Sequence, residues 1–103
     1  MNQLSSAAEF ETAIKNGNVI VDFYAQWCGP CRGLSTTLDA IVKEHDVTVL
    51  KVDVDKYQSL ASKHRVSSIP HLVFFKKGSK VHEQKGACSK KALEAVITKH
   101  FNS

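Results

Sequence analysis

The sequence has 103 residues, of which 43% are hydrophobic and 23% charged, and its formal net charge is +4. This length predicts one domain over residues 1–103 that buries roughly two-thirds of its unfolded surface without disulfide staples. Three cysteines are too few for a disulfide framework, and neither a secretory signal nor an apolar run of membrane-spanning length is evident. We therefore expect a soluble, cytoplasmic monomer in a reducing compartment, without membrane contact.

The positive charge is concentrated in the second half of the chain. Residues 1–50 carry three Lys or Arg against six Asp or Glu, whereas residues 51–103 carry eleven against four. The basic half could face an acidic partner, or it could be an ordinary solvated surface that folding mixes with the acidic half. The lysines are scattered and have no interleaved aromatic residues, so the sequence does not indicate nucleic-acid binding.

Two short elements are expected at the start of the chain. Residues 2–4 are suited to a short edge strand, and Ser6 with Glu9 three residues later is typical of a capping box that opens a helix. The buried face of that helix is expected to comprise Ala7, Phe10 and Ile14. A turn at residues 16–18 ends it.

The most informative segment is 27–31, of sequence Trp-Cys-Gly-Pro-Cys, which lies between the apolar run 19–25 and an amphipathic segment that extends to about Glu44. This pattern predicts a strand buried on both faces, a tight loop and a helix. A helix that begins at the cysteines directs unpaired N–H groups and the positive end of its dipole towards Cys28, which favours a thiolate there. Cys28 is therefore expected to be the attacking thiol, with Cys31 deeper, one turn into the helix.

The residues between the two cysteines suit a helix start. Pro30 has its φ preset and lacks an N–H that would have no partner there, and Gly29 leaves the approach to the sulfur unobstructed. Cysteines at this spacing can cycle between dithiol and disulfide with little backbone movement. The alternative is half of a zinc site, but Cys88 and the five scattered histidines supply no second close pair of ligands, so we expect no metal.

The remaining elements alternate between strands and helices, as their apolar periodicity indicates. They are a strand at 47–54, a short helix at 58–64 with Leu60 and Ala61 inward, a strand at 71–75, a turn at 77–79, a return strand at 80–85, and a last helix with Ser89 as N-cap. This order predicts an α/β fold with a central mixed sheet of about five strands flanked by four helices. Function is then expected at the carboxyl ends of the strands, where the Cys28 loop lies.

Over essentially its full length the chain resembles the thioredoxin family, and most closely its eukaryotic-type cytosolic members. The matching segments are residues 21–23, 27–31, 51–55, 69–70, 74–78 and 86–87. The resemblance implies the thioredoxin fold, no cofactor bound to this chain, and a protein-disulfide reductase in which Cys28 attacks and Cys31 resolves. It also implies recycling by thioredoxin reductase, an FAD enzyme fed by NADPH, and substrates such as peroxiredoxins or ribonucleotide reductase.

Two other functions remain open on the same fold. An oxidase or isomerase is the nearer alternative. The Gly-Pro pair between the cysteines and the lack of a signal sequence or second domain argue against it. A binding module or a reductase-independent subunit is the other. The intact Cys28, Cys31 and Asp22 argue that chemistry has been kept.

Asp22 lies inside an apolar strand ahead of the cysteines, where burial should raise the pKa of its carboxyl. Such a group can accept a proton from Cys31 and later return it. The alternative is an ion pair with Lys51 that serves structure alone. The resemblance supports the proton-transfer role, with Lys51 as the nearby charge that limits the rise in pKa.

The resemblance also implies a cis peptide bond between Ile69 and Pro70, opposite the cysteines, although most such bonds are trans. The Ile69 backbone would then pair with an extended segment of the substrate as an added strand. The flat, mostly apolar docking surface would comprise Trp27, Gly29, Pro30, Ile69, Gly86 and Ala87. For Trp27 the alternative is an ordinary place in the core.

Two departures from the family pattern concern Thr36 and His71. Thr36 stands where bacterial members often carry a helix-kinking proline, and His71 stands where the family usually has threonine. His71 follows Pro70 directly, so its imidazole could lie beside Cys28 and tune the thiolate; the alternative is a solvent-facing ring that points away, because side chains alternate along a strand. Cys88, just after Ala87, is either a buried, inert thiol or an oxidisable one that slows docking or links two molecules.

Overall fold

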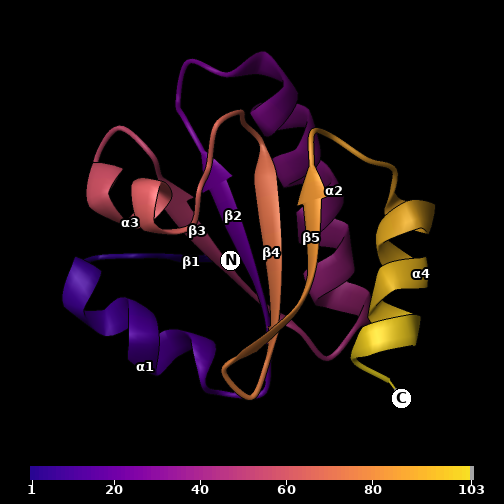
Figure 1. Ribbon diagram of the computed structural model, residues 1–103. Coiled ribbons are helices and arrows are strands. Elements are labelled where there is room, and N and C mark those ends of the chain that lie inside the picture. The colour runs from indigo at the N-terminus through magenta and orange to yellow at the C-terminus, as the bar shows by residue number, and fades with distance from the viewer. Residues whose placement is uncertain (103) are drawn as a thin grey trace.

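The computed structural model, which describes residues 1–102, has a five-stranded sheet with helices on both faces (Figure 1). The strands are β1 (Asn2–Gln3), β2 (Asn18–Tyr24), β3 (Thr48–Asp53), β4 (His71–Lys76) and β5 (Ser79–Lys85). The helices are the 3-10 turn η1 (Ala7–Glu9), α1 (Phe10–Ile14), α2 (Gly29–Glu44), α3 (Gln58–Lys63) and α4 (Lys90–His100). The predicted α/β architecture with a mixed sheet and four α-helices is confirmed.

The strand order in the sheet is β1-β3-β2-β4-β5. Strands β1, β3 and β2 are parallel, β4 runs antiparallel to β2, and β5 runs antiparallel to β4. The order makes β2 the central strand, and its residues 19–23 are all buried. This position explains why the run is almost continuously apolar, since a strand covered on both faces has no solvent side.

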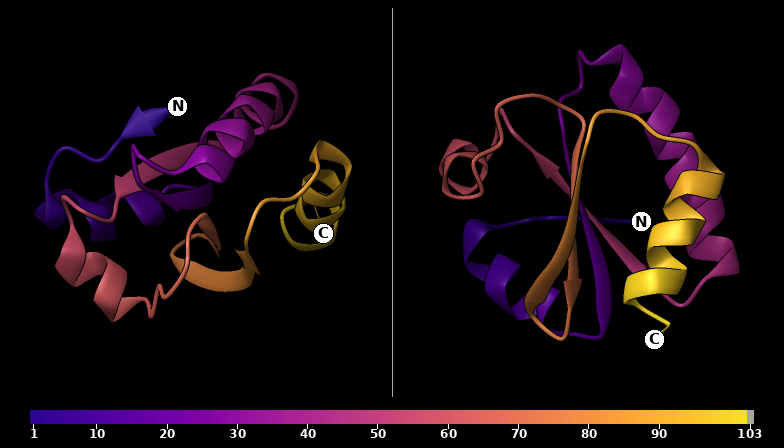
Figure 2. Two further views of the ribbon diagram at one scale, coloured as in Figure 1. Left: turned by 90° about the horizontal axis from the view of Figure 1, so that it is seen from above. Right: turned by 45° about the vertical axis from the view of Figure 1, so that its right-hand side comes forward.

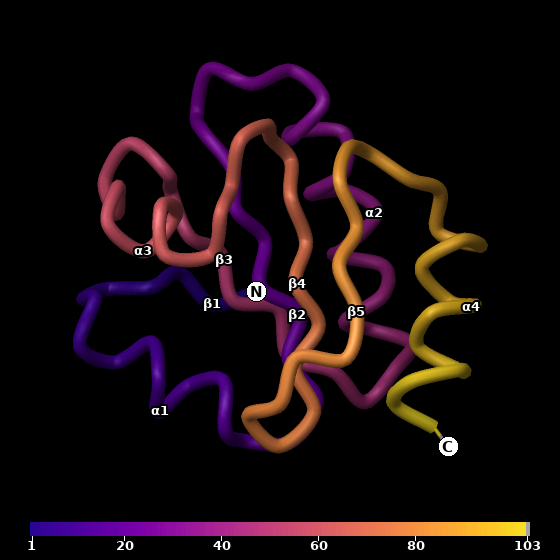
Figure 3. Tube along the Cα trace, in the orientation of Figure 1, coloured from indigo at the N-terminus to yellow at the C-terminus, as the bar shows by residue number. Residues whose placement is uncertain are grey.

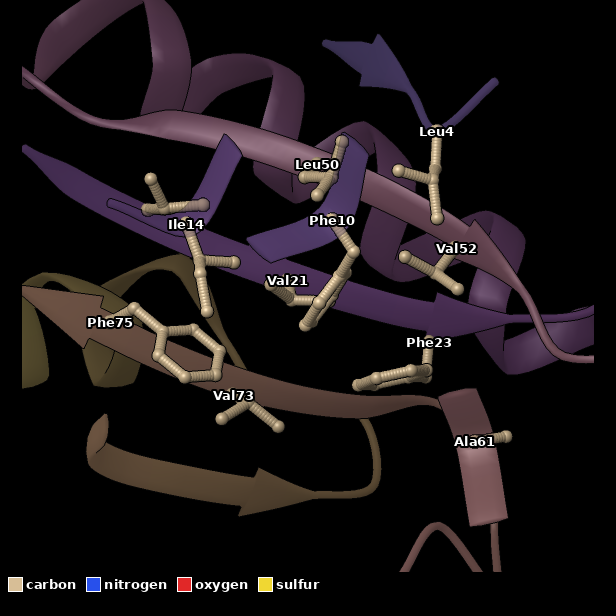
Figure 4. Packing of buried hydrophobic residues seen from close by; sticks show 11 residues of the cluster. Leu4, Phe10, Ile14, Val21, Phe23, Leu50, Val52, Ala61, Val73 and Phe75 are labelled. Carbon is tan, nitrogen blue, oxygen red and sulfur yellow. The ribbon is translucent and has the colours of Figure 1, made fainter. Parts of the chain in front are cut away.

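Helices cover both faces of the sheet (Figure 2), and side chains along the strands alternate between two cores, one on each face. On the α1/α3 face, helix residues Phe10, Ile14 and Ala61 pack with the strand residues that Figure 4 labels. On the α2/α4 face, the core comprises Ile20, Leu34, Leu38, Ile41, Val49, Leu72, Phe74, Leu93, Ile97 and Phe101. Residues one position apart on β2 or β4 therefore lie on opposite sides of the sheet.

The start of the first helical segment differs from the prediction. The Ser6 side chain makes no capping hydrogen bond, and it is Ser5 that donates its backbone N–H and its hydroxyl to Glu9 Oε1, at 2.6 and 2.9 Å. Ala7 is exposed, so its predicted burial is wrong. The physical reason is the 3-10 turn η1, whose three-residue repeat shifts which side chains face the sheet before α1 begins.

The other helices follow the prediction closely. Helix α2 runs without interruption through Thr36 to Glu44, and Ser89 caps α4 by accepting a hydrogen bond from the Ala92 N–H at 3.1 Å. In α3, Ala61 is buried, whereas Leu60 is only half-buried. No helix within residues 1–102 combines the length and apolar character needed to cross a membrane.

Three loops that are distant in sequence meet at one end of the sheet, at the top of Figure 3. Strand β2 ends there and leads to α2, β4 begins there, and β5 ends there. The Gly86 N–H donates a hydrogen bond to the Pro70 carbonyl at 2.9 Å, which holds the end of β5 against the start of β4. This end of the sheet carries the cysteines.

Candidate active site

Cys28 and Cys31 form a disulfide at the beginning of α2, with their Cα atoms 5.3 Å apart. Cys28 is the N-cap, and its sulfur accepts a hydrogen bond from the Cys31 N–H at 3.2 Å. Gly29 and Pro30 follow as the first helical residues, where the missing N–H of Pro30 costs no hydrogen bond. The arrangement places the Cys28 sulfur at the positive end of the helix dipole, which stabilises a thiolate.

The disulfide sits in a small apolar setting. Cys28 is 4% exposed and Cys31 is 2% exposed, so in this disulfide form the two sulfur-bearing residues differ little in depth. They pack with Ala25, and Ile69 covers the same cluster. Access to the sulfurs is therefore narrow, and a substrate or reductant must approach them past the surrounding loops.

Asp22 is fully buried on β2, and neither of its carboxylate oxygens has a hydrogen-bond partner among residues 1–102. Burial raises the pKa of Asp22 to about 6, while the charge of Lys51 acts in the opposite direction. Asp22 alternates with Val21 and shares the α2/α4 face with Ile20, so it lies on the side of the sheet that α2 covers. A carboxyl in this state can take up or release a proton near neutral pH.

Lys51 lies beside Asp22 on β3 but does not form an ion pair with it. Its ammonium donates to the Ser35 hydroxyl at 3.1 Å and lies 4.3 Å from the centroid of the Tyr24 ring. Ser35 is one turn after Cys31 on α2. Sequence reasoning missed Ser35 and Tyr24, although the i, i+4 spacing from Cys31 was a signal for Ser35.

A cavity of about 220 Å³ lies next to this group, and its lining includes Cys31, Ser35 and Lys51. The same cavity reaches the exposed residues Gln26 and Arg32. It therefore connects Cys31 and the Lys51 ammonium group with the protein surface.

The segments named for substrate docking come together around the disulfide. The Ile69–Pro70 peptide bond is cis, and Ile69 packs against the cluster that contains the cysteines. Gly29, Pro30 and Ala87 are exposed, while Ile69 and Gly86 are half-buried. The structure thus brings the docking candidates to one end of the sheet.

Trp27 is 70% exposed, so the alternative that it is a core residue is wrong. Its indole N–H donates to Asp55 Oδ2 at 2.8 Å, and the Asp55 backbone N–H donates in turn to Asp53 Oδ1 at 2.9 Å. An exposed indole held by a hydrogen bond is a preorganised apolar surface. Asp55 was not singled out from the sequence, because nothing in its spacing links it to Trp27.

His71 is buried, so the interpretation that its ring faces the solvent is wrong, and a tuning effect of His71 on Cys28 stays a prediction. The residue is 1% exposed, and its Nε2 hydrogen-bonds Glu83 Oε2 at 2.7 Å. Its ring packs edge-on against Phe23, with centroids 6.2 Å apart, on the α1/α3 face and thus opposite the face that α2 covers. Alternation along β4 produces this placement, because His71 is in phase with Val73 and out of phase with Leu72.

Cys88 is a free, half-buried cysteine that packs against the core of the α2/α4 face. Burial raises the pKa of the Cys88 thiol. A higher pKa means less thiolate and slower thiol chemistry at neutral pH.

The fold and the Cys28–Cys31 pair define the class of this protein: it is a thiol-disulfide oxidoreductase with the thioredoxin fold. The thioredoxin family profile matches residues 2–99, and the chain belongs to the thioredoxin family. It is 43% identical over 101 residues to a thioredoxin of Chlamydia trachomatis, covering 97% of this chain and 99% of that protein. It is 39% identical over 96 residues to a thioredoxin of Staphylococcus epidermidis, covering 91% of this chain and 92% of that protein.

Solved structures agree with the sequence relatives. Thioredoxin from Fasciola hepatica superimposes with a TM-score of 0.87 at 39% identity, covering 97% of this chain and 99% of that one. A mutant thioredoxin from Halobacterium salinarum gives a TM-score of 0.91 at 35% identity, covering 97% of this chain and 89% of that one. Identities to bacterial and animal members are similar, so the comparisons assign the family and not the eukaryotic-type subgroup.

Proposed function

We propose that this protein reduces disulfide bonds in other proteins, with Cys28 as the attacking thiol. In the dithiol form the Cys28 thiolate attacks one substrate sulfur, the substrate S–S bond breaks, and the released thiolate takes up a proton. Cys31 then loses its proton and attacks the Cys28 sulfur, which releases the second substrate thiol and forms the Cys28–Cys31 disulfide. Two electrons pass to the substrate. The position of Cys28 as the helix N-cap is the observation that carries this assignment.

Asp22 is proposed as the base that accepts the Cys31 proton. Its buried carboxyl, with a pKa raised to about 6, is ionised at neutral pH yet remains a stronger base than an ordinary aspartate. Lys51 acts as a positioning residue, because its ammonium holds the Ser35 hydroxyl on the side of α2 that carries Cys31. The positive charge of Lys51 also limits the free-energy cost of burying the ionised Asp22 carboxylate.

The docking proposal rests on the exposed Trp27 and Pro30 and on the half-buried Ile69 beside the disulfide. An extended substrate segment that adds a strand to the Ile69 backbone brings its sulfur towards Cys28. Apolar contacts with the indole supply affinity without a deep pocket, which suits a protein that accepts many disulfides.

Recycling by an NADPH-fed, FAD-containing thioredoxin reductase is proposed from family membership, as is action in the cytoplasm as a monomer. Peroxiredoxins are proposed as one substrate class and ribonucleotide reductase as another. A similar solved structure supports peroxiredoxins as substrates. It has 33% identity and a TM-score of 0.85 to this chain, and it concerns the thiol-resolving mechanism of yeast mitochondrial 1-Cys peroxiredoxin via glutathione/thioredoxin systems.

The test is a reduction assay with insulin as the disulfide substrate, driven either by dithiothreitol or by NADPH with a thioredoxin reductase. The wild-type protein is expected to reduce insulin catalytically in both formats, whereas C28S is inactive. C88S is the matched control, because it removes a cysteine outside the disulfide, and it should keep wild-type turnover. Loss of activity in C88S with activity retained in C28S would reject the assignment, and oxidation of reduced peptides without insulin reduction would favour an oxidase.

A further inference from the structure

A second cavity, of about 470 Å³, lies on the α1/α3 face between the end of α3 and β5. It shares no lining residue with the docking surface around the disulfide. Its volume falls in the range of sites that bind small molecules. Its lining is strongly basic: it carries the cations Lys63, Arg65, Lys80 and Lys85, together with Glu83 and His64.

Two of these cations are already matched by carboxylates. Lys63 Nζ lies 3.2 Å from Glu11 Oε1, and Lys80 Nζ lies 2.7 Å from Glu83 Oε1. Hydrogen bonds from Lys80 and His71 hold the pKa of Glu83 below its usual range, so this carboxylate is ionised but fully engaged. The single acidic residue in the lining is therefore offset by its own partners.

The other two cations have no such match. Arg65 and Lys85 are exposed, and within residues 1–102 their side chains take part in none of the ion pairs or side-chain hydrogen bonds. They extend from different elements, Arg65 from the loop after α3 and Lys85 from the end of β5, onto one cavity. An uncompensated charge of about +2 thus faces a bounded space.

Arg65 stands at a position where glycine is the expected residue. Its φ is +56°, and it follows the C-cap of α3, where its N–H donates to the Ser62 carbonyl at 3.0 Å and the next N–H, of Val66, donates to the Ala61 carbonyl at 2.9 Å. This pair of bonds is the Schellman motif, whose left-handed residue is usually glycine. An arginine there is strained, and the motif fixes the point from which its guanidinium reaches the cavity.

We propose that this cavity binds small molecules that carry a di- or triphosphate group. Two unmatched cations call for an anion with at least two charges, and a guanidinium forms paired hydrogen bonds with phosphate oxygens. Lys63 and Lys80 line the same cavity, but their charges are matched by Glu11 and Glu83, so the net positive charge comes from Arg65 and Lys85. Inorganic polyphosphate and nucleotides share this chemistry, and they differ only in what lies beyond the phosphates.

His64 provides a local reporter of the bound anion. Its ring lines the cavity and packs against Phe10 and Phe23. Burial and the charge of Lys63 hold the pKa of His64 below its usual range; Lys80 acts in the same direction, and Glu11 and Glu83 act against it. An anion placed among these groups favours the protonated ring, so it raises the His64 titration midpoint.

The experiment measures binding of inorganic tripolyphosphate and of ADP to the full chain at low salt, by calorimetry and by backbone NMR. The double variant R65G/K85Q removes both unmatched cations, and glycine suits the φ of Arg65, so the fold is retained. The matched control K43Q/K91Q removes the same charge from α2 and α4, on the opposite face. We expect R65G/K85Q to weaken binding at least about tenfold and K43Q/K91Q to weaken it less than about twofold.

Saturable binding, with shifts centred on the lining residues and a raised His64 titration midpoint, supports the site for either ligand. If ADP binds more tightly than tripolyphosphate, the nucleoside contributes; equal affinity identifies the phosphate chain as the whole ligand. Equal weakening in both double variants means general charge attraction and overturns the proposal. A His64 midpoint that neither ligand changes also overturns it, because the anion then lies elsewhere.

Discussion

Asp22 and Lys51 are direct neighbours in the register of β2 and β3, yet the Lys51 ammonium bonds the Ser35 hydroxyl, 3.1 Å away, and not the Asp22 carboxylate. No ion pair joins the two within residues 1–102, and both carboxylate oxygens lack a hydrogen-bond partner there. A purely structural pair would satisfy both charges. The observed arrangement leaves Asp22 as a buried acid whose pKa is raised to about 6, which costs stability and favours proton transfer.

The substitution D22N should therefore stabilise the fold while slowing turnover. The carboxyl pKa rises from 3.8 to about 6 on folding, which corresponds to roughly 3 kcal/mol of lost stability at pH 8, as an upper bound for the gain in D22N. Between these two pKa values the folded state holds the proton that the unfolded state has lost, so wild-type stability falls as pH rises through this window. Below pH 4 the two proteins should be about equally stable.

Chemical denaturation of both proteins at pH 3.5 and pH 8 measures this difference, and insulin turnover measures the kinetic effect. We expect the gain in stability only at the higher pH, with turnover reduced because Cys31 must lose its proton before it can resolve the mixed disulfide. Unchanged turnover with lower stability at pH 8 would contradict the role given to Asp22.

The substitution H71T should leave the Cys28 thiolate titration unchanged. The imidazole hydrogen-bonds Glu83 on the α1/α3 face, so its loss should instead destabilise the fold by about 1–3 kcal/mol. Thiolate absorbance against pH tests the first statement and chemical denaturation the second. The variant E83Q removes the same carboxylate partner and serves as the comparison. A shift of the thiolate curve in H71T, without one in E83Q, would show that His71 does tune Cys28.

The strand and helix pattern was predictable because it depends on local periodicity, and the burial of Asp22 followed from its apolar neighbours in β2. The site was predictable where residues are close in sequence, as for Cys28 and Cys31. Contacts between distant segments were not: the indole of Trp27 on Asp55, and the imidazole of His71 on Glu83, depend on register and on which face a side chain occupies. A one-residue change of phase also explains why Ser5 and not Ser6 bonds Glu9.

The substitution W27A should weaken substrate docking with little effect on folding. The side chain is 70% exposed, so its removal should change the free energy of unfolding by less than about 1 kcal/mol. KM for insulin should rise several-fold, whereas the rate with a small aromatic disulfide, which needs no docking surface, should change little. D55N weakens the acceptor of the indole N–H and should raise KM less than W27A does. Equal loss with both substrates would assign Trp27 to the chemistry.

The substitution R65G should raise stability by about 0.5–1 kcal/mol, since the left-handed backbone at φ +56° is costly for arginine and the greater freedom of glycine in the unfolded chain offsets only part of the gain. Thermal and chemical denaturation measure this change. S62G, three residues earlier and inside α3, is the control and should lower stability by about 0.5 kcal/mol. If R65G is less stable than the wild-type protein, the Arg65 guanidinium stabilises the fold by itself, and the strain argument fails.

The order of the two cysteines is the central claim, and trapping of the mixed disulfide tests it most directly. C31S, reduced and incubated with insulin, should accumulate a covalent adduct that peptide mapping by mass spectrometry locates at Cys28, because no resolving thiol remains. C28S treated in the same way should accumulate almost none, since Cys31 lies within the first turn of α2 and not at the N-cap, where the helix dipole favours a thiolate. An adduct that forms on Cys31 in C28S, with none on Cys28 in C31S, would contradict the account.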